Sequence, residues 1–269
     1  MQRDSITKLK HLKDNLKKMD SVAIGFSGGV DSTFLLKIAS EILGKNVVAI
    51  TTSSSIHPEK ELENGKKLAK MMNVKHLIIN LDIGEIEQFK ENPPNRCYHC
   101  KKHIFSKIKE AAKKENINHV LDASNYDDLQ DYRPGMDALK ELGIISPLID
   151  VKLTKKEIRD LSKKINLDTW NKPSFACLAS RFPYGINITK KRLMVVEKAE
   201  EVIQSLGVKQ FRVRYNTETA RIEVPKNDFK TILKHSEEIV KQFKELGFKY
   251  ITLDIEGFRT GSLNEVLTL

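Results

Sequence analysis

Six consecutive residues have the types and spacing needed to bind a phosphate: Ser27-Gly28-Gly29-Val30-Asp31-Ser32. Two adjacent glycines permit positive φ angles and a close approach of the backbone to a ligand. Backbone N–H groups at the start of a helix that follows such a turn form an anion-binding nest, to which the serine hydroxyls add donors. The string lacks the lysine of the Walker loop and the spacing of the dinucleotide fingerprint. A plain glycine turn with serine caps is the alternative, and we expect a phosphate-binding loop.

Three cysteines, Cys97, Cys100 and Cys177, form a second candidate site. Four interpretations compete: inert core residues, a redox pair, a zinc site completed by His99 or His103, and an iron–sulfur cluster that three thiolates hold with one iron open. Polar neighbours count against inert core residues for the pair. The pair also lies outside the first strand–helix unit, which counts against a thioredoxin-like motif. Spacing alone does not separate zinc from iron–sulfur.

A third candidate is the polar segment 122–136, "DASNYDDLQDYRPGM". Carboxylates there can hold Mg²⁺ or ribose hydroxyls, and an arginine can hold a phosphate. A solvated, Asx-rich loop is the alternative. Because the segment follows an expected strand, we favour a functional role for its polar residues, which are Asn125, Asp127, Asp128, Asp131 and Arg133.

The elements that must position these groups alternate between strands and helices. Short apolar runs predict strands at 21–27, 46–54, 74–81 and 118–125, and helical patterns predict helices at 32–43, 57–72 and near 102–116, after an amphipathic helix at the N-terminus. Such alternation is typical of an α/β fold, a doubly wound parallel sheet with helices on both faces. Ligands of such sheets bind beyond the carboxyl ends of the strands.

The pattern changes near residue 185, and the remainder predicts a smaller α+β domain. A helix is expected at 189–207, paired strands at 210–216 and 220–225, a lysine-rich helical stretch, and a last strand at 250–258. We therefore place one domain at 1–185 and a second at 186–269. Alternate residues of a strand share a face, so Arg212 and Arg214 can bind the same anion. A solvated basic face is the alternative.

Composition limits the classes of protein. The chain has 269 residues, 40% hydrophobic and 30% charged, so it can build a sizeable core. No apolar run approaches the roughly 20 residues that span a bilayer, and the N-terminus lacks the apolar core of a signal peptide. We expect a cytoplasmic protein with reduced thiols. The net charge of +10 suits anionic ligands or a solvated basic surface.

The loop "SGGVDS" between an expected strand and helix resembles the PP-loop of the ATP pyrophosphatases. That resemblance implies ATP with its pyrophosphate in the loop, cleavage between the α- and β-phosphates, and an adenylated substrate. Mg²⁺ commonly assists by neutralising the phosphates. It also implies that the end of the second strand, which carries Thr51, Thr52 and Ser53, lies near adenine.

Five further sequence motifs together resemble those of the LarE-type sulfur transferases of nickel-pincer cofactor biosynthesis. They are "NPPNRCYHCK", "DYRPGM", "KPSFACLASRFPYG", "FRVRYNTETARIEV" and "GFRTGSLN". The resemblance spans nearly the whole chain. It implies a nucleotide-hydrolase-like domain, a small C-terminal domain and a homo-oligomer. It further implies adenylation of a carboxylate of pyridinium-3,5-biscarboxylic acid mononucleotide, followed by its conversion to a thiocarboxylate with sulfide or another sulfur donor.

Members of this family differ in their sulfur source. Some have only the cysteine of the "ACLASR" motif, which is Cys177 here, and sacrifice its sulfur to leave dehydroalanine. Others carry three cysteines and use a [4Fe-4S] cluster. This chain has all three, so the resemblance favours the cluster form with Cys97, Cys100 and Cys177 as ligands and sulfide on the open iron. Asp31 and Glu223 are expected in catalysis, and Ser180, Arg181, Arg212 and Arg214 near the substrate phosphate.

Two other classes of function compete with this expectation. A tRNA thiolase also combines a PP-loop with three cysteines, and the positive charge suits RNA. Because the sequence shows no aromatic-rich RNA module, we expect a small nucleotide substrate and no nucleic-acid or membrane partner. A zinc-stabilised nucleotide sensor would form no AMP.

Overall fold

The computed structural model describes residues 2–130, 133–173 and 176–267. The chain forms two compact units. The first comprises Met1–Ile86 with Asn95–Ser174, and the second comprises Glu87–Pro94 with Phe175–Leu269. The short segment 87–94 thus belongs with the C-terminal part of the chain. Among the described residues, no helix is long and apolar enough to cross a membrane.

The first unit is built on a four-stranded parallel sheet with the order β3-β2-β1-β4. The strands are β1 (Val22–Gly25), β2 (Val47–Ser53), β3 (Lys75–Asn80) and β4 (His119–Leu121). The helices are α1 (Gln2–Lys17), α2 (Val30–Leu43), α3 (Glu59–Met71), α5 (Arg96–Lys114), α6 (Gly135–Glu141), α7 (Pro147–Asp150) and α8 (Lys155–Lys164). The predicted doubly wound parallel sheet is confirmed.

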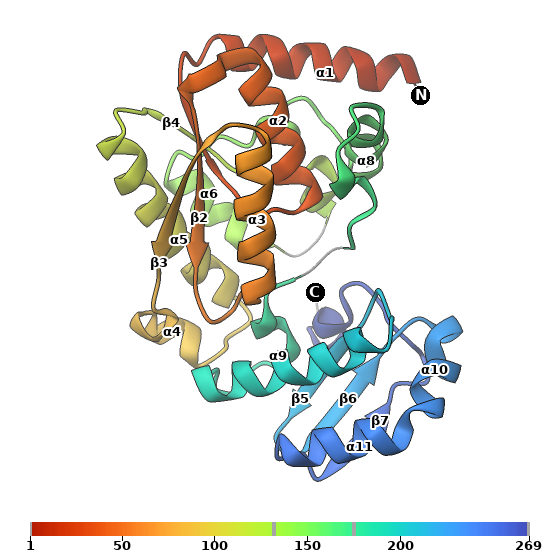
Figure 1. The fold of residues 1–269 in the computed structure, drawn as a ribbon. Coiled ribbons are helices and arrows are strands. Elements are labelled where there is room, and N and C mark those ends of the chain that lie inside the picture. The colour runs from red at the N-terminus through yellow and green to blue at the C-terminus, as the bar shows by residue number, and fades with distance from the viewer. Residues whose placement is uncertain (1, 131–132, 174–175, 268–269) are drawn as a thin grey trace. The chain divides into compact units, whose positions relative to one another are not determined.

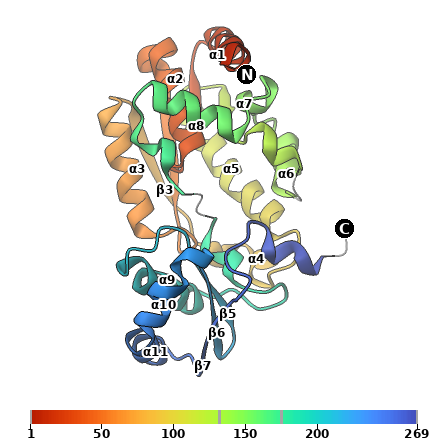
Figure 2. The ribbon, with the colours of Figure 1, turned by 90° about the vertical axis from the view of Figure 1, so that its right-hand side faces the viewer.

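Alternation along the strands explains why helices cover both faces of the sheet. Ile24 and Ala49 join a core with α1, α2 and α8, whereas Ala23 and Val48 join a second core with α5 and α6. Successive residues of a strand point to opposite faces, so a strand that is buried on both sides reads as a continuous apolar run. Figure 2 shows α3 and α5 on opposite sides of the strands, and Figure 1 shows α1 and α2 together at one end of this unit.

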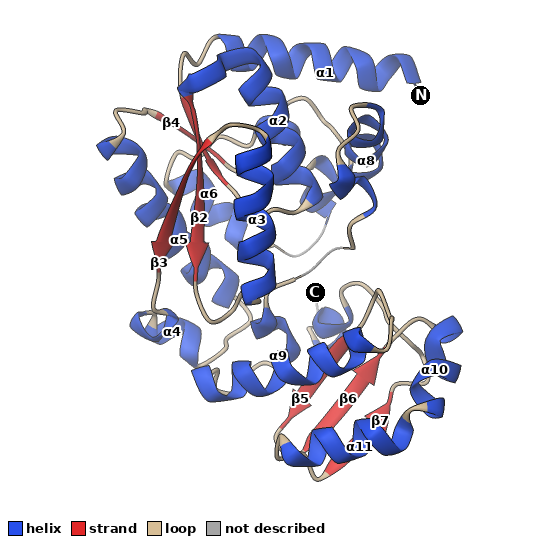
Figure 3. Cartoon of the chain, viewed as in Figure 1, coloured by secondary structure: helices blue, strands red, loops and turns tan. Residues whose placement is uncertain are grey.

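The second unit has a three-stranded sheet with the order β5-β6-β7, in which β5 and β6 are antiparallel and β6 and β7 parallel. Its elements are α4 (Glu87–Lys90), α9 (Lys190–Ser205), β5 (Arg212–Asn216), β6 (Thr219–Glu223), α10 (Phe229–Lys234), α11 (Ser236–Glu245) and β7 (Tyr250–Leu253) (Figure 3). Val213, Ala220 and Ile222 pack under the helices. The opposite face therefore carries the charged residues that alternate with them.

Three expectations need correction. The helix expected near 102–116 begins at Arg96, so Cys97 and Cys100 lie within it, because Pro93-Pro94 ends the preceding segment and leaves Asn95 to begin the helix. The last strand ends at Leu253, where a turn closed by the Gly257 N–H begins. Helices α6, α7 and α8 were not predicted.

Candidate active site

The phosphate loop lies between the end of β1 and the start of α2, at the carboxyl edge of the sheet. Gly28 has φ +67°, a conformation that favours glycine, and it lies against Gly65 on α3, where a Cβ on Gly28 would meet the Gly65 Cα at 3.4 Å, an ordinary contact. The hydroxyls of Ser27 and Ser32 are 3.1 Å apart, and Ser27 Oγ accepts from the Gly29 N–H at 3.4 Å. The first N–H groups of α2 have no carbonyl partner within the helix, which leaves them for an anion.

Asp31, in the first turn of α2, is a half-buried carboxylate that forms an ion pair with Lys155. Its Oδ2 accepts from Lys155 Nζ at 2.5 Å, and its Oδ1 has no hydrogen-bond partner among the described residues. Burial raises the pKa of Asp31, and Lys155 partly offsets that rise. A carboxylate in this state gains stability from any additional cation, so its open oxygen fits a Mg²⁺ ligand.

The loop after β4 is folded back on itself and on the start of α8. Asp128 accepts from the backbone N–H of Asn125 at 2.9 Å and pairs with Arg133 at 2.9 Å. Asp127 accepts from the Lys155 N–H at 2.8 Å. The loop thus positions Lys155, and the charge of Asp128 also raises the pKa of Asp31. Asp131 lies outside the described residues.

The end of β2 supports the phosphate loop from behind. Thr51 is buried, and its hydroxyl donates to the carbonyl of Phe26 at 2.6 Å. A hydroxyl has one hydrogen to donate, so the 2.8 Å contact with His76 is donated by Nε2–H of the ring. Thr52 and Ser53 are half-buried at the end of the strand. Sequence reasoning missed His76, because a lone histidine in a strand gives no signal of its partner.

Lys172 was also missed. Its Nζ donates to the Gly28 carbonyl at 3.0 Å and to Glu61 on α3 at 2.6 Å. The guanidinium of Arg159 donates to the carbonyls of Trp170 and Lys172, both at 2.7 Å, and fixes this segment. An ammonium group therefore lies directly beside the phosphate loop, five residues before Cys177 in the sequence.

Cys97 and Cys100 are one helical turn apart at the start of α5, so they share a face of the helix. Cys97 is exposed and Cys100 is buried. A Cβ on Gly135 would lie 3.3 Å from the Cys97 carbonyl, so the start of α6 packs closely on this turn. Among the described residues, no group of three or more His, Cys, Asp or Glu side chains is arranged to hold a metal ion. Cys177 belongs to the second unit.

Cys177 begins the short turn η5 (Leu178–Arg181), and its carbonyl accepts three bonds. The donors are Ser180 N at 3.0 Å, Ser180 Oγ at 2.9 Å and Arg181 Nη1 at 3.1 Å. Arg181 is 1% exposed and bidentate to Glu200 on α9, at 2.8 and 2.9 Å. Arg181 was expected near the substrate phosphate; here it fixes the turn that carries Cys177.

The polar face of the second sheet concentrates positive charge. Arg214 donates to Glu223 at 2.9 and 2.8 Å and to the Ser180 carbonyl at 2.7 Å. Arg212 lies on the same face of β5, as predicted, with its guanidinium 5.0 Å from the centre of the Phe258 ring. Burial, followed by the charge of Arg181, lowers the pKa of Arg212 to about 10. An anion bound here would relieve that repulsion.

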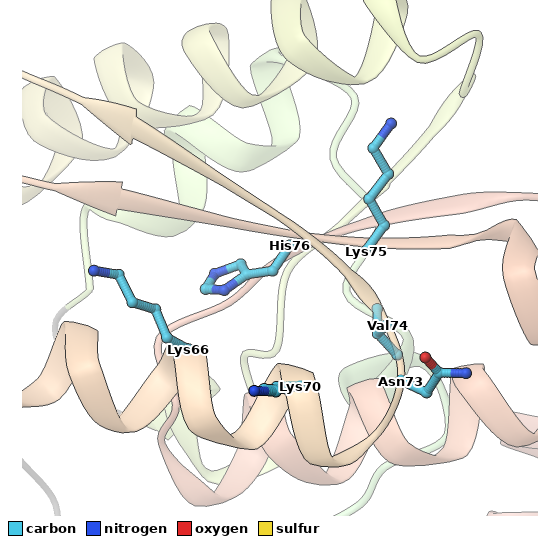
Figure 4. A pocket seen from close by; sticks show the side chains of 6 residues that line it. All are labelled: Lys66, Lys70, Asn73, Val74, Lys75 and His76. Atoms are coloured by element: carbon cyan, nitrogen blue, oxygen red, sulfur yellow. The ribbon is translucent and has the colours of Figure 1, made fainter.

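A hollow of about 350 Å³ lies between α3 and the start of β3. Figure 4 shows Lys66 and His76 on the α3 side, with Lys75 pointing away from them. Burial and the nearby Lys66 charge lower the pKa of His76, so its ring is neutral at pH 7. The hollow lies at the edge strand β3, and His76 links it to Thr51 at the base of the phosphate loop. Its lining is Lys66, Lys70, Asn73, Val74, Lys75 and His76.

The parallel sheet and the glycine loop at its carboxyl edge define the class: a PP-loop protein that uses ATP. A profile described as a PP-loop domain matches residues 1–133. The chain is 41% identical over 265 residues to an uncharacterised protein of Synechocystis, covering 97% of this chain and 98% of that one. It is 35% identical over 263 residues to the pyridinium-3,5-bisthiocarboxylic acid mononucleotide synthase of Lactiplantibacillus plantarum, covering 97% and 95%. An uncharacterised protein of Methanocaldococcus jannaschii is 34% identical over 258 residues, covering 95% and 98%. The chain therefore belongs to the LarE-type family of ATP-dependent sulfur transferases.

Proposed function

We propose that this protein inserts sulfur into pyridinium-3,5-biscarboxylic acid mononucleotide in an ATP-dependent reaction. A substrate carboxylate attacks the α-phosphorus of ATP, pyrophosphate leaves, and an acyl-adenylate forms. A sulfide nucleophile then attacks the acyl carbon and expels AMP to give the thiocarboxylate. The observation that carries the proposal is the similarity to the bisthiocarboxylic acid mononucleotide synthase over nearly the full length of both chains.

The phosphate loop supplies the first step. The N–H groups at the start of α2 and the hydroxyls of Ser27 and Ser32 bind the departing pyrophosphate. Asp31 Oδ1 would hold Mg²⁺, which neutralises phosphate charge when it is bound. Lys155 opposes the rise that burial causes in the pKa of Asp31. Asn125, Asp127, Asp128 and Arg133 would complete the nucleotide site, and Thr51, Thr52 and Ser53 would lie near adenine.

The polar face of β5 and β6 would hold the phosphate of the substrate. Arg212 and Arg214 lie on one face, with Ser180 beside Arg214. Arg212 lies among Arg181, Arg214, Glu200 and Glu223, and Arg221 on β6 is the cross-strand partner of Arg214. Arginines therefore outnumber glutamates where an anion would bind. Glu223 is 0% exposed and orients Arg214. A buried, oriented guanidinium is well suited to bidentate phosphate binding.

Cys97, Cys100 and Cys177 would hold a [4Fe-4S] cluster. Thiolates are the ligands that iron–sulfur clusters take, and Cys97 and Cys100 lie one turn apart on one face of α5, as two ligands of one cluster can. When bound, the cluster would supply the sulfide nucleophile. His103 Nε2 is buried without a hydrogen-bond partner among the described residues, so a zinc site with His103 is the competing donor set.

The test is purification without oxygen, followed by measurement of iron, acid-labile sulfide and zinc and by visible spectroscopy. We expect iron and sulfide with the broad visible absorption of an iron–sulfur protein. Cys97→Ala should abolish sulfur transfer and leave ATP–pyrophosphate exchange intact. Iron-free protein that transfers a single sulfur and converts Cys177 to dehydroalanine would instead establish sacrificial transfer. Bound zinc without AMP formation would overturn the proposal.

A further inference from the structure

We propose that Lys172 is a positioning residue that fixes the orientation of the peptide between Gly28 and Gly29, and so keeps one N–H donor of the phosphate loop directed at its anion. Lys172 Nζ donates to the Gly28 carbonyl at 3.0 Å and to Glu61 on α3 at 2.6 Å. All four residues belong to the first unit. The inference rests on the proposed function in one respect, namely that the loop binds the pyrophosphate of ATP.

Bonds from the sheet and from α2 hold the phosphate loop on either side of this peptide. The Phe26 carbonyl accepts from the Thr51 hydroxyl at 2.6 Å, and the Gly29 carbonyl accepts from the Thr33 N–H at 3.0 Å. The Gly28–Gly29 peptide lies between these two fixed points, with a glycine on each side of it. Because glycine adopts either sign of φ, this peptide can turn over at little steric cost. Its orientation therefore depends on the bonds that its own C=O and N–H groups make.

The two polar groups of this peptide face opposite ways. A trans peptide is planar and carries its C=O and N–H on opposite sides, so a bond to one group sets the direction of the other. Lys172 holds the Gly28 carbonyl, while the Gly29 N–H is directed at the Ser27 hydroxyl, 3.4 Å away. That hydroxyl lies 3.1 Å from the hydroxyl of Ser32. The bond from Lys172 thus favours the orientation in which the N–H joins the two hydroxyls, and a turned peptide would direct a carbonyl oxygen at the anion instead.

The ammonium group of Lys172 is itself held in place. Arg159 on α8 donates to the carbonyls of Trp170 and Lys172, both at 2.7 Å, and the Lys172 N–H donates to the Thr169 carbonyl at 3.0 Å. Glu61 supplies a countercharge, and the side chains of this pair are only 17% and 22% exposed. Hydrogen bonds from a charged donor are stronger than those between neutral groups. Lys172 therefore reaches the Gly28 carbonyl from a fixed backbone and with a fixed direction.

The sequence offers a direct probe of this peptide, because Gly28–Gly29 is the one pair of adjacent glycines among 13. When glycine is labelled with ¹³C at its carbonyl and with ¹⁵N, the Gly29 nitrogen alone is bonded to a labelled carbonyl and gives a single carbonyl–amide correlation in NMR spectra. In ligand-free Lys172→Met we expect this correlation to move upfield in the carbonyl dimension and to broaden. Pyrophosphate should bind about tenfold more weakly in calorimetry. The matched control is Lys37→Met, which breaks an ion pair with Glu41 on α2 and should change neither measurement.

The outcomes separate positioning from a simple effect of charge. If Lys172→Met leaves the correlation in place, or displaces it while pyrophosphate binds as in the parent, Lys172 does not position this peptide for the anion. Lys172→Arg keeps the positive charge. If Lys172→Arg binds pyrophosphate normally although its correlation is displaced, charge alone is responsible and the proposal is wrong.

The same measurements keep this inference apart from the proposed function. A parent protein that binds no pyrophosphate would refute the role proposed for the loop, while the Gly28–Gly29 correlation would still report whether Lys172 orients the peptide. Should Lys172→Met not fold, it is combined with Glu61→Gln, which removes the carboxylate left without its cation. A folded double variant with the parent's correlation would also refute the proposal.

Discussion

Two opposing effects act on the pKa of the Asp31 carboxyl group. Burial is the largest influence on its pKa and raises it, while Lys155 acts in the other direction. In the proposed function this carboxylate holds Mg²⁺, and its charge is lost as the pH falls through the pKa of Asp31. Under that proposal, the ion pair with Lys155 extends the activity of the phosphate loop to lower pH.

Lys155→Ala should move the acid limb of ATP–pyrophosphate exchange to higher pH, because the pKa of Asp31 rises when its cation is removed. At neutral pH the loss of a charged hydrogen bond should weaken adenylation by about tenfold or more. The matched control is Lys156→Ala, whose exposed side chain pairs with Asp160 on the same helix. A pH profile of Lys155→Ala that coincides with the parent's would show that Asp31 does not depend on Lys155.

Arg181→Met should destabilise the protein by roughly 3–5 kcal/mol, since Glu200 would remain buried without its cation. Unfolding in urea gives the measurement. Lys107→Ala removes an exposed pair with Glu110 and should cost only about 0.3 kcal/mol. A small effect of Arg181→Met, combined with a selective loss of substrate affinity, would instead support the original expectation that Arg181 binds the substrate phosphate.

Strand β2 supports the phosphate loop, although the loop itself lies between β1 and α2. Thr51 on β2 holds the Phe26 carbonyl at the end of β1 and receives a bond from His76 on β3. Its hydroxyl therefore joins three neighbouring strands at the base of the phosphate loop.

Thr51→Val keeps the shape of the side chain and removes both bonds. It should cost about 1–3 kcal/mol of stability, because His76 Nε2–H loses its partner in a part-buried place. ATP should bind more weakly in calorimetry, since the end of β1 loses its support. Thr219→Val, at a half-buried threonine of β6 in the second unit, is the control. If the two variants bind ATP equally well, the bond to Phe26 does not position the loop.

Local sequence could predict the elements and the loop, but not their long-range partners. The apolar run of β1 followed by two glycines predicts the phosphate loop, because both signals lie within a few residues. Lys172 beside Gly28, and Asn92 beside Pro183, join residues 144 and 91 apart in sequence. Nothing local marks such pairs. The cysteine helix was placed too late in the chain because its first turn is polar and follows two prolines.

The boundary between the two units can be tested with two C-terminal fragments of different length. A fragment of residues 186–269 lacks Arg181 and would leave Glu200 buried without its partner. It also lacks Phe182, whose ring packs 5.2 Å from that of Tyr215. We expect it to be less stable than a fragment of residues 175–269 by roughly 3–5 kcal/mol. Urea unfolding followed by circular dichroism measures the difference, and equal stability would support the predicted boundary at 185/186.

Residues 87–94 belong to a unit whose other members come much later in the sequence. On the ribosome, Asn92 emerges 90 residues before Phe182, its hydrogen-bond acceptor. At about 5–20 residues per second, that segment waits roughly 5–18 seconds for its partner. Phe89, which belongs to the same unit, is 1% exposed in the folded protein. The rest of its unit therefore cannot cover this side chain until about two-thirds of the chain has been made.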